Sequence, residues 1–293
     1  MTMNKVGRAF DILFNRGAGA VRERGKHLSA RERLALAFRG ALTRRVTVND
    51  GERSYYFECH GEEELYRVRT LYEKEPGTLH WIDSELRPND VFFDIGANIG
   101  LFTIYAACRL KRPGAAYAFE PHAPSFCSLL RNIELNGIRN RVHALSCALH
   151  VEDGFFPFNY RVLTPGASDS QLDSMRTAEQ KKFKPKAVEL KQGAGVDTLI
   201  RQGVIESPDL VKIDVDGNEL LILQGMEKLL CGTQAPRAIQ VEVNPRYPEL
   251  RDYLKGTGFR LAERHYTVYQ ERRLAAGTCL PEQAGYNGIF RKS

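Results

Sequence analysis

Long hydrophobic runs, a secretion signal and clustered cysteines are all missing from this sequence. No apolar stretch approaches the ~18 residues that a membrane-spanning helix needs. Basic residues near the start are not followed by a continuous apolar stretch, so the sequence predicts no signal peptide. No two cysteines have metal-ligand spacing, which argues against a cysteine-bound metal. These absences predict a cytoplasmic protein whose thiols stay free, namely Cys59, Cys108, Cys127, Cys147, Cys231 and Cys279.

Acidic residues are scarce in the first 45 positions. This segment has eleven Lys and Arg residues against three Asp and Glu residues, an excess of eight positive charges, whereas the whole chain of 293 residues has a net charge of +6. The remainder is therefore close to neutral, at −2. We interpret residues 1–45 as a basic leader with helical pieces near 6–14 and 30–42. Two interpretations stay open for it: peripheral contact with an anionic membrane on its inner face, or a solvated, partly disordered appendage.

A glycine-rich turn follows a short apolar run at residues 91–93. The run ends in Asp94, and the turn places Asn98 between Gly96 and Gly100 before helical apolar spacing begins. A strand, a glycine-rich turn and a helix form the nucleotide site of α/β sheets, because glycine lets the backbone approach a ligand and the helix start presents free N–H groups. Asn is the residue besides glycine that best tolerates a left-handed turn.

A second acid supports the same interpretation. Residues 115–119 are typical of a buried strand, and Glu120 follows them about twenty residues after Gly100. An acid at this strand end holds the two ribose hydroxyls of a bound adenosine. The alternative, a surface turn followed by an unrelated Glu, is less consistent with both features occurring together.

Strands and helices alternate from residue 91 onward, which predicts a parallel α/β sheet. We expect further strands at 141–149, 210–216 and 238–244, and helices at 124–136, 196–202 and 219–230. Residues 152–191 interrupt the alternation as a long loop with β-like pieces at 155–160 and 187–191, the size of a lid or substrate loop. The C-terminal part is predicted as a helix at 247–255 followed by strands at 259–263, 267–270 and 288–291.

Before the sheet, residues 46–48 and 54–58 are predicted to pair as a hairpin, and helices are predicted at 62–72 and 79–86. We therefore divide the chain into the basic leader 1–45, an N-terminal cap 46–90, and a ligand-binding domain 91–293.

Polar residues alternate with apolar ones in two central strands. Lys212, Asp214 and Asp216 share one face of the fourth strand, and Gln240, Glu242 and Asn244 share one face of the fifth. Buried unpaired charges are costly, so these side chains must pair with each other, face a cleft or hold a ligand. A structural ion pair between Lys212 and Glu242 is one interpretation. A ligand site at the strand exits, where doubly wound sheets bind ligands, is the other.

These segments resemble the FkbM family of S-adenosylmethionine-dependent methyltransferases. The resemblance rests on residues 75–79, 93–100, 119–121 and 211–220, and more loosely on 196–199 and 240–242, in the family's order. It spans about residues 46–293 and departs at Asp216, where most members have Glu. The resemblance implies a Rossmann-like class I methyltransferase fold, with a mostly parallel seven-stranded sheet, an antiparallel C-terminal hairpin and a small N-terminal cap.

The resemblance also implies roles for individual residues. S-adenosylmethionine would be the cofactor, and the acceptor would be a hydroxyl of a sugar, a glycolipid or polysaccharide precursor, or another small molecule. Asp94, Gly96, Asn98 and Gly100 would line the methionine part of the cofactor, and Glu120 would hold its ribose. The rest of the turn and the residues after the third strand would complete the cofactor site, namely Ala97, Pro121, Cys147 and Ala148.

Asp214, Asp216, Glu242 and His265 are the candidates for the base or for acceptor contact. His122 lies near the cofactor side and His150 on an open loop, so both are less suitable. Carboxylate and amide oxygens at two strand ends also suit Mg²⁺, but Lys212 on the same face would repel a dication, so we favour a metal-free reaction.

Other functions fit the sequence less well. A nicotinamide dehydrogenase would need Gly at position 98, where this chain has Asn, and a nucleobase amine methyltransferase would need an Asn-Pro-Pro-Tyr-like motif where residues 214–217 stand. A non-catalytic cofactor-binding scaffold is the remaining alternative. No specific nucleic-acid partner is predicted.

Overall fold

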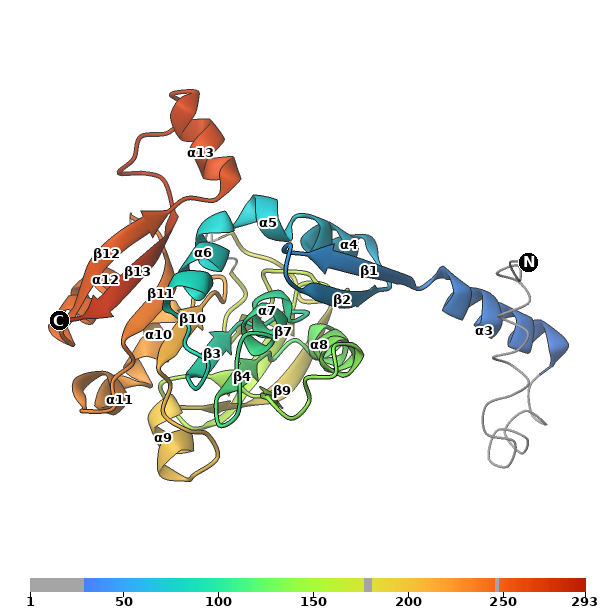
Figure 1. The fold of residues 1–293 in the computed structure, drawn as a ribbon, viewed down its shortest axis with the longest axis horizontal. Coiled ribbons are helices and arrows are strands. Elements are labelled where there is room, and N and C mark those ends of the chain that lie inside the picture. The colour runs from blue at the N-terminus through green and yellow to red at the C-terminus, as the bar shows by residue number, and fades with distance from the viewer. Residues whose placement is uncertain (1–28, 177–180, 246–247) are drawn as a thin grey trace.

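The computed structural model describes residues 29–176, 181–245 and 248–293. A seven-stranded sheet occupies its centre (Figure 1). In spatial order its strands are β12 (Phe259–His265), β13 (Tyr286–Lys292), β11 (Ala238–Val243), β10 (Leu210–Ile213), β3 (Val91–Ile95), β4 (Ala115–Phe119) and β5 (Val142–Leu145). β13 is antiparallel to both of its neighbours, while every other pairing in the sheet is parallel. The predicted fold class is confirmed.

The strand order reverses between β3 and β10. From β3 the chain steps outward through β4 and β5, whereas β10 and β11 lie on the other side of β3. At such a reversal the connections leave in opposite directions, and a crevice opens beyond the carboxyl ends of the two strands. The sequence therefore places its glycine-rich turn, which follows β3, and Asp214, which follows β10, on either side of this crevice.

Helices cover both faces of the sheet, and β3 is therefore buried on both of its faces. Phe92 packs into one apolar cluster and Phe93 into the other, as period two requires. The first cluster is completed by α6 (Pro76–Glu85), α7 (Leu101–Ala107) and α8 (Ala123–Leu135). The second is completed by α9 (Val196–Arg201), α10 (Glu219–Gln224), α11 (Glu227–Cys231) and α12 (Glu249–Gly256).

The predicted N-terminal hairpin is present as β1 (Arg44–Asn49) and β2 (Ser54–Cys59), paired antiparallel. Tyr55 and Phe57 are buried and join the first apolar cluster, so the hairpin packs on the helical layer over the sheet. α4 (Glu62–Arg69) and α5 (Leu71–Lys74) then lead to α6. The division of the chain at residues 45 and 90 stays a prediction.

α3 (Ala30–Leu42) extends from β1 away from the body of the molecule (Figure 1). The helix predicted near 30–42 is therefore confirmed, while the one near 6–14 lies outside the described residues. Ser29 caps α3 by accepting the Glu32 N–H. Leu34, Leu36 and Phe38 on this helix are exposed.

The 152–191 segment is a second sheet rather than a loop. Its two predicted β-like pieces are confirmed as β7 (Gly154–Tyr160) and β9 (Ala187–Ala194), which pair antiparallel. β8 (Gln171–Leu172) pairs with β7, and β6 (Ala148–Leu149) pairs with β9. The single strand predicted at 141–149 is therefore wrong. The chain leaves the edge of the large sheet after Leu145 and enters the small sheet at Ala148, because β4, the only partner of β5 in the described residues, ends at Phe119 opposite Leu145.

The strand predicted at 267–270 is also wrong. Thr267 instead caps a helix, α13 (Val268–Ala275), by accepting the Gln270 N–H. Thr is a preferred cap residue, and this local bond outweighs the β propensity of Val268 and Tyr269. The remaining predicted helices are present, although 62–72 and 219–230 are each divided in two. Every helix in the described ranges is too short or too polar to cross a bilayer.

Candidate active site

The turn after β3 has the backbone that its glycines predicted. Gly96, Asn98 and Gly100 have φ values of 79°, 51° and 91°, all in the left-handed region. A Cβ at Gly96 would lie 1.9 Å from the Asp214 carbonyl oxygen, so a side chain there would force the two segments apart. Glycine at this position thus brings the turn into backbone contact with the exit of β10.

A buried lysine joins the two strands beneath the turn. The Lys212 Nζ lies 3.2 Å from Asp94 Oδ1 and 3.6 Å from Asp214 Oδ2. Asp94 Oδ2 accepts the Thr103 hydroxyl at 2.5 Å. The ion pair between Lys212 and Glu242, one of the two interpretations of the sequence, is therefore wrong. The parallel register sets Lys212 opposite Asp94 on one side and Gln240 on the other, so its ammonium reaches the acid on β3.

These contacts set the charge of Asp214. Burial alone would raise the pKa of Asp214, but the Lys212 ammonium, together with the Lys74 and Arg67 cations, outweighs burial and lowers it. The pKa of Lys212 is raised in turn: burial lowers it, and the Asp94 and Asp214 carboxylates more than reverse that effect. Asp214 is thus an ionised carboxylate with a side chain 36% exposed, next to the glycine-rich turn.

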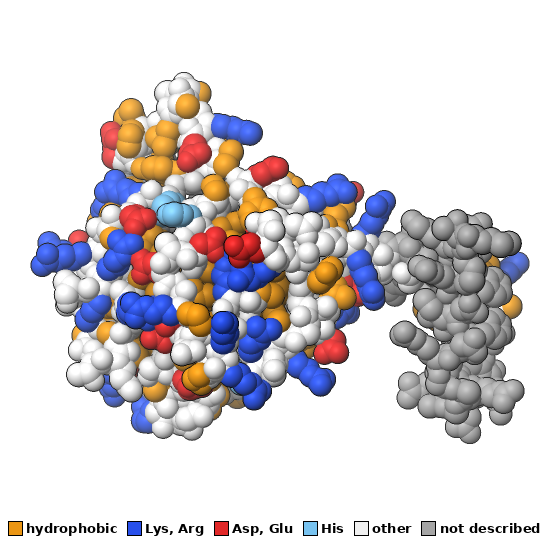
Figure 2. Space-filling view, in the orientation of Figure 1, with side chains coloured by type: hydrophobic (Ala, Val, Ile, Leu, Met, Phe, Trp, Pro, Cys, Tyr) orange, Lys and Arg blue, Asp and Glu red, His pale blue; other side chains and the backbone are white. Residues whose placement is uncertain are grey.

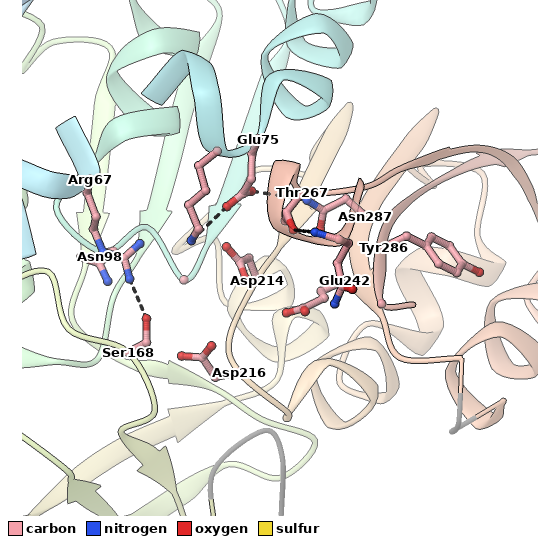
Figure 3. A pocket seen from close by; sticks show the side chains of 14 residues that line it. Arg67, Glu75, Asn98, Ser168, Asp214, Asp216, Glu242, Thr267, Tyr286 and Asn287 are labelled. Atoms are coloured by element: carbon pink, nitrogen blue, oxygen red, sulfur yellow. Dashed lines mark hydrogen bonds and ion pairs between the residues drawn. The ribbon is translucent and has the colours of Figure 1, made fainter. Parts of the chain in front are cut away.

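A polar pocket of about 260 Å³ opens over this carboxylate (Figure 3). Asp214, Asp216 and Glu242 line it together, as predicted from the two strand exits, and Gly96 and Asn98 line it from the turn. The opposite wall comes from residues of α13 and of β13 and its approach, to which the sequence patterns assigned no role: Thr267, Gln270, Gly285, Tyr286 and Asn287. Because residues 267–270 were predicted as a strand, the sequence did not indicate that Thr267 and Gln270 line the pocket.

The carboxylates in the pocket are not equivalent. Burial within the recess, followed by repulsion from Asp214, raises the pKa of Glu242 to about 8, although the side chain is exposed to the pocket. The same two causes raise the pKa of Asp216, which has φ of 60°. Behind them, Glu219 is buried, and burial raises its pKa to about 7. The Gly217 N–H that Glu219 accepts at 3.0 Å acts in the opposite direction. Asp214 is therefore ionised, whereas the pKa values of the neighbouring acids are all raised, that of Glu242 to about 8.

His265 does not join the pocket residues. Its Nε2 lies 3.0 Å from Glu263 Oε2, and Glu263 in turn pairs with Arg291. A Cβ at Gly77 would lie 2.4 Å from the His265 ring, so the imidazole packs against the start of α6. This ring is held outside the pocket and away from Asp214.

The predicted ribose side is more enclosed. The Glu120 carboxylate accepts the Asn98 N–H at 2.6 Å and the His122 N–H at 2.7 Å, and its side chain is only 6% exposed. Burial raises the pKa of Glu120 to about 7. Ala148 is buried, and Pro121 and Cys147 are half-buried. Glu120 therefore lies directly behind the turn, in the position expected from the sequence, and its lone pairs are oriented by two backbone amides.

Residues 161–170, the β7–β8 connection, cover this side. The Val162 carbonyl lies 2.9 Å from His122 Nε2, and the Ala167 carbonyl accepts Asn98 Nδ2 at 3.1 Å. At its far end the Asp169 N–H donates to Asp216 Oδ2 at 2.9 Å. One segment therefore contacts both the glycine-rich turn and a pocket carboxylate, which is consistent with the lid expected for this part of the chain.

Three more pocket residues come from the N-terminal helices: Arg67 on α4, Lys74 at the end of α5, and Glu75. The sequence offered a signal only for Glu75, which begins one of the segments that resemble the family. Across the described residues, no group of three or more His, Cys, Asp and Glu side chains is arranged to hold a metal ion.

The strand order, the turn at the reversal point, the acids after β10 and Glu242 near the end of β11 define a Rossmann-like methyltransferase, and comparison with known proteins agrees. Residues 94–261, more than half of the chain, match the model described as Methyltransferase FkbM domain. The chain belongs to the FkbM methyltransferase family, as its motifs predicted, and is a methyltransferase rather than a dehydrogenase.

Three relatives show the breadth of this family. Methyltransferase sdnD of Sordaria araneosa is 35% identical over 178 residues, which cover 53% of this chain and 68% of that protein. The 31-O-demethyl-FK506 methyltransferase FkbM of Streptomyces tacrolimicus is 30% identical over 223 residues, covering 66% and 79%. Hexuronic acid methyltransferase AglP of Haloferax volcanii is 26% identical over 191 residues, covering 64% and 70%.

Proposed function

We propose that this chain is an S-adenosylmethionine-dependent O-methyltransferase that acts on a hydroxyl of a sugar, a glycolipid or polysaccharide precursor, or another small molecule. The observation that carries the proposal is the ionised Asp214 carboxylate at the floor of the pocket, held by Lys212 and in backbone contact with the glycine-rich turn. A base next to a cofactor turn is what methylation of a hydroxyl requires.

The turn fits the cofactor. The Asn98 Oδ1 atom is buried and has no hydrogen-bond partner within the described part of the chain, so it is ready to accept a bond from a ligand. Gly96, Ala97, Asn98 and Gly100 would hold the methionine half over Asp94, Glu120 would hold the ribose, and Pro121, Cys147 and Ala148 would border the adenine. When bound, S-adenosylmethionine supplies a methyl group on a sulfonium centre.

Asp214 is the group we assign to the acceptor proton. Its carboxylate stays ionised at neutral pH because of Lys212, so it accepts the hydroxyl proton while the acceptor oxygen is held in the pocket. Glu242 keeps its proton up to about pH 8 and therefore donates a hydrogen bond to the acceptor. Asp216 orients the acceptor from the side that the β7–β8 connection closes. His265 is left out, since its ring pairs with Glu263.

The far wall of the pocket suits an acceptor rich in hydroxyls. Gln270 Oε1 is buried without a partner in the described residues and lines the pocket, and Thr267 and Asn287 stand beside it. Such a wall offers several acceptors and donors and little apolar surface. The names of two relatives, a hexuronic acid methyltransferase and a 31-O-demethyl-FK506 methyltransferase, support an oxygen-rich acceptor.

Transfer of a labelled methyl group from S-adenosylmethionine tests this proposal. We expect the purified chain to label one class within a panel of glycan, glycolipid and hydroxylated natural-product fractions, without added Mg²⁺. Labelling of carboxyl or amine groups alone would contradict the O-directed assignment. Loss of labelling in EDTA that Mg²⁺ restores would contradict the metal-free mechanism.

A further inference from the structure

Arg67 is a cation without a matching anion. Its Nη2 donates to Ser168 Oγ at 2.6 Å and its Nε donates to the Gly166 carbonyl, and both acceptors are neutral. Within the described residues it forms no ion pair with a carboxylate. The guanidinium is half-buried and has five N–H donors, so these two bonds leave donors unused. A partly desolvated guanidinium with unused N–H donors is suited to bind a carboxylate.

The guanidinium lies at the cofactor turn. A narrow recess beside the main pocket is lined by Gly96, Ala97 and Asn98 below and by Arg67 and Lys74 above. The same two cations also line the main pocket, so the recess and the pocket lie next to each other. In Figure 3 Arg67 lies across the cavity from Glu242, with Asp214 between them.

The charges of the cavity are therefore divided. The ionised Asp214 carboxylate lies on one side, where it favours a cationic centre and repels an anion, and Asp216 and Glu242 line the same side. Arg67 occupies the other side. Lys74 contributes less positive potential there, because its Nζ lies 3.4 Å from Glu75. A ligand with a positive centre and a carboxylate a few bonds apart matches this division.

We propose that Arg67, assisted by Lys74, binds the carboxylate of the methionine half of S-adenosylmethionine. This inference rests on the proposed function. It makes α4 of the N-terminal hairpin region part of the cofactor site, and it gives the bond from Arg67 to Ser168 a role: the β7–β8 connection holds the guanidinium at the correct angle. Arg67 is a positioning residue for the cofactor and takes no proton in the reaction.

Calorimetric binding of two ligands to the full chain tests the inference. S-adenosylhomocysteine contains the amino-acid carboxylate, and 5′-methylthioadenosine lacks it. We expect the wild-type chain to bind the first more tightly. In Arg67→Gln the affinity for S-adenosylhomocysteine should fall on the order of 10- to 100-fold, because a charge-assisted bidentate contact is lost. The affinity for 5′-methylthioadenosine should not change. Arg67→Lys keeps the charge but not the two parallel N–H donors of the guanidinium. Its affinity for S-adenosylhomocysteine should therefore lie between those of the wild type and Arg67→Gln.

Two further variants separate this role from a structural one. Arg69→Gln removes an exposed cation from the same helix and should change neither affinity. Ser168→Ala removes one of the two bonds that orient the guanidinium but keeps its charge and its bond to the Gly166 carbonyl, so the preference for S-adenosylhomocysteine should weaken by less than in Arg67→Gln. An equal loss for both ligands in Arg67→Gln would show that Arg67 only supports the fold of the site, and no loss for either would show that its anion belongs to the acceptor. Both outcomes overturn the inference.

The same measurements distinguish the two proposals. A wild-type chain that binds neither nucleoside contradicts the proposed function itself. A wild-type chain that binds both, together with an Arg67→Gln variant of unchanged preference, contradicts only the assignment of Arg67.

Discussion

The large sheet and the small sheet serve the site by different means. In the large sheet, parallel register fixes which side chains meet: Lys212 lies opposite Asp94, and Asp214 after β10 lines the same pocket as Glu242 near the end of β11. The small sheet has strands as short as two residues, and its contribution comes largely from main-chain groups of the β7–β8 connection. The chemical groups of the site are thus side chains that the strands of the large sheet position. The cover is instead held by main-chain groups of a segment that side-chain patterns do not specify.

The sharpest test of the large sheet is Asp214→Asn. The amide has nearly the same shape but cannot accept the acceptor proton, so turnover should fall at least ~100-fold while affinity for S-adenosylhomocysteine stays nearly unchanged. Turnover and calorimetric affinity measured on the same preparation check this. Near-normal turnover would remove Asp214 from the mechanism and leave the large sheet with only a binding role.

Glu120 accepts the N–H groups of Asn98 in the turn and of His122, whose ring lies 2.9 Å from the Val162 carbonyl of the β7–β8 connection. Glu120→Ala should weaken cofactor binding by about 1–3 kcal/mol through loss of hydrogen bonds to the ribose. Ribose hydroxyls favour the ionised carboxylate, so wild-type affinity should rise as pH increases through about 7. Glu120→Gln should abolish that dependence. Equal affinity in wild type and Glu120→Ala would contradict the ribose assignment.

Glu242 tests whether the acids in the pocket differ as described. Because its pKa is raised to about 8, the protonated donor is present below that pH and lost above it. Turnover should therefore decline several-fold above about pH 8 in the wild type. Glu242→Gln keeps a donor that does not titrate, so its profile should lack the alkaline decline. The same alkaline decline in both proteins would assign it to another group.

Gln171 tests the small sheet. Its Nε2 donates to the Asp216 carbonyl at 2.8 Å, and its Oε1 accepts Asn218 Nδ2 at 3.3 Å. Gln171→Ala removes these bonds without changing a charge, so we expect a smaller effect, of the order of a few-fold in turnover. Single-turnover kinetics would measure it. A loss as large as that of Asp214→Asn would show that the cover contributes to the chemistry itself.

The leader belongs to neither sheet and should affect the reaction least. We propose that residues 1–45 bind an anionic membrane through their positive excess and the exposed Leu34, Leu36 and Phe38 of α3. Removal of residues 1–43 should leave turnover on a water-soluble acceptor unchanged and abolish sedimentation with anionic vesicles at low salt. Equal vesicle binding by the full and shortened chains would contradict this role. In Figure 2 Lys and Arg side chains are also spread over the visible face of the body. The shortened chain keeps those side chains, so it measures how much vesicle binding the body contributes.

The features that could be predicted from the sequence lie mainly in the large sheet. Buried strands and their exits were readable, because an apolar run that ends in Asp94, or an alternation such as 211–216, is compatible with few structures besides a strand. The partner of Lys212 was not readable, since period two assigns a face but not which neighbouring strand supplies the counter-charge. Arg67 gave no signal because it lies in a helix among other charged residues. The α13 wall was missed because a single cap bond from Thr267 decides between helix and strand there.

The position of β13 has a consequence for synthesis of the protein. β13 is made after β12, yet it lies between β11 and β12 and bonds to both. A ribosome-bound chain that has exposed everything up to β12 therefore lacks the strand to which both β11 and β12 bond, and these edges are still unpaired. Tyr286 and Asn287, which belong to β13, close part of the pocket wall. The acceptor side of the pocket is accordingly completed only once β13 has been made, later in synthesis than the glycine-rich turn on the cofactor side.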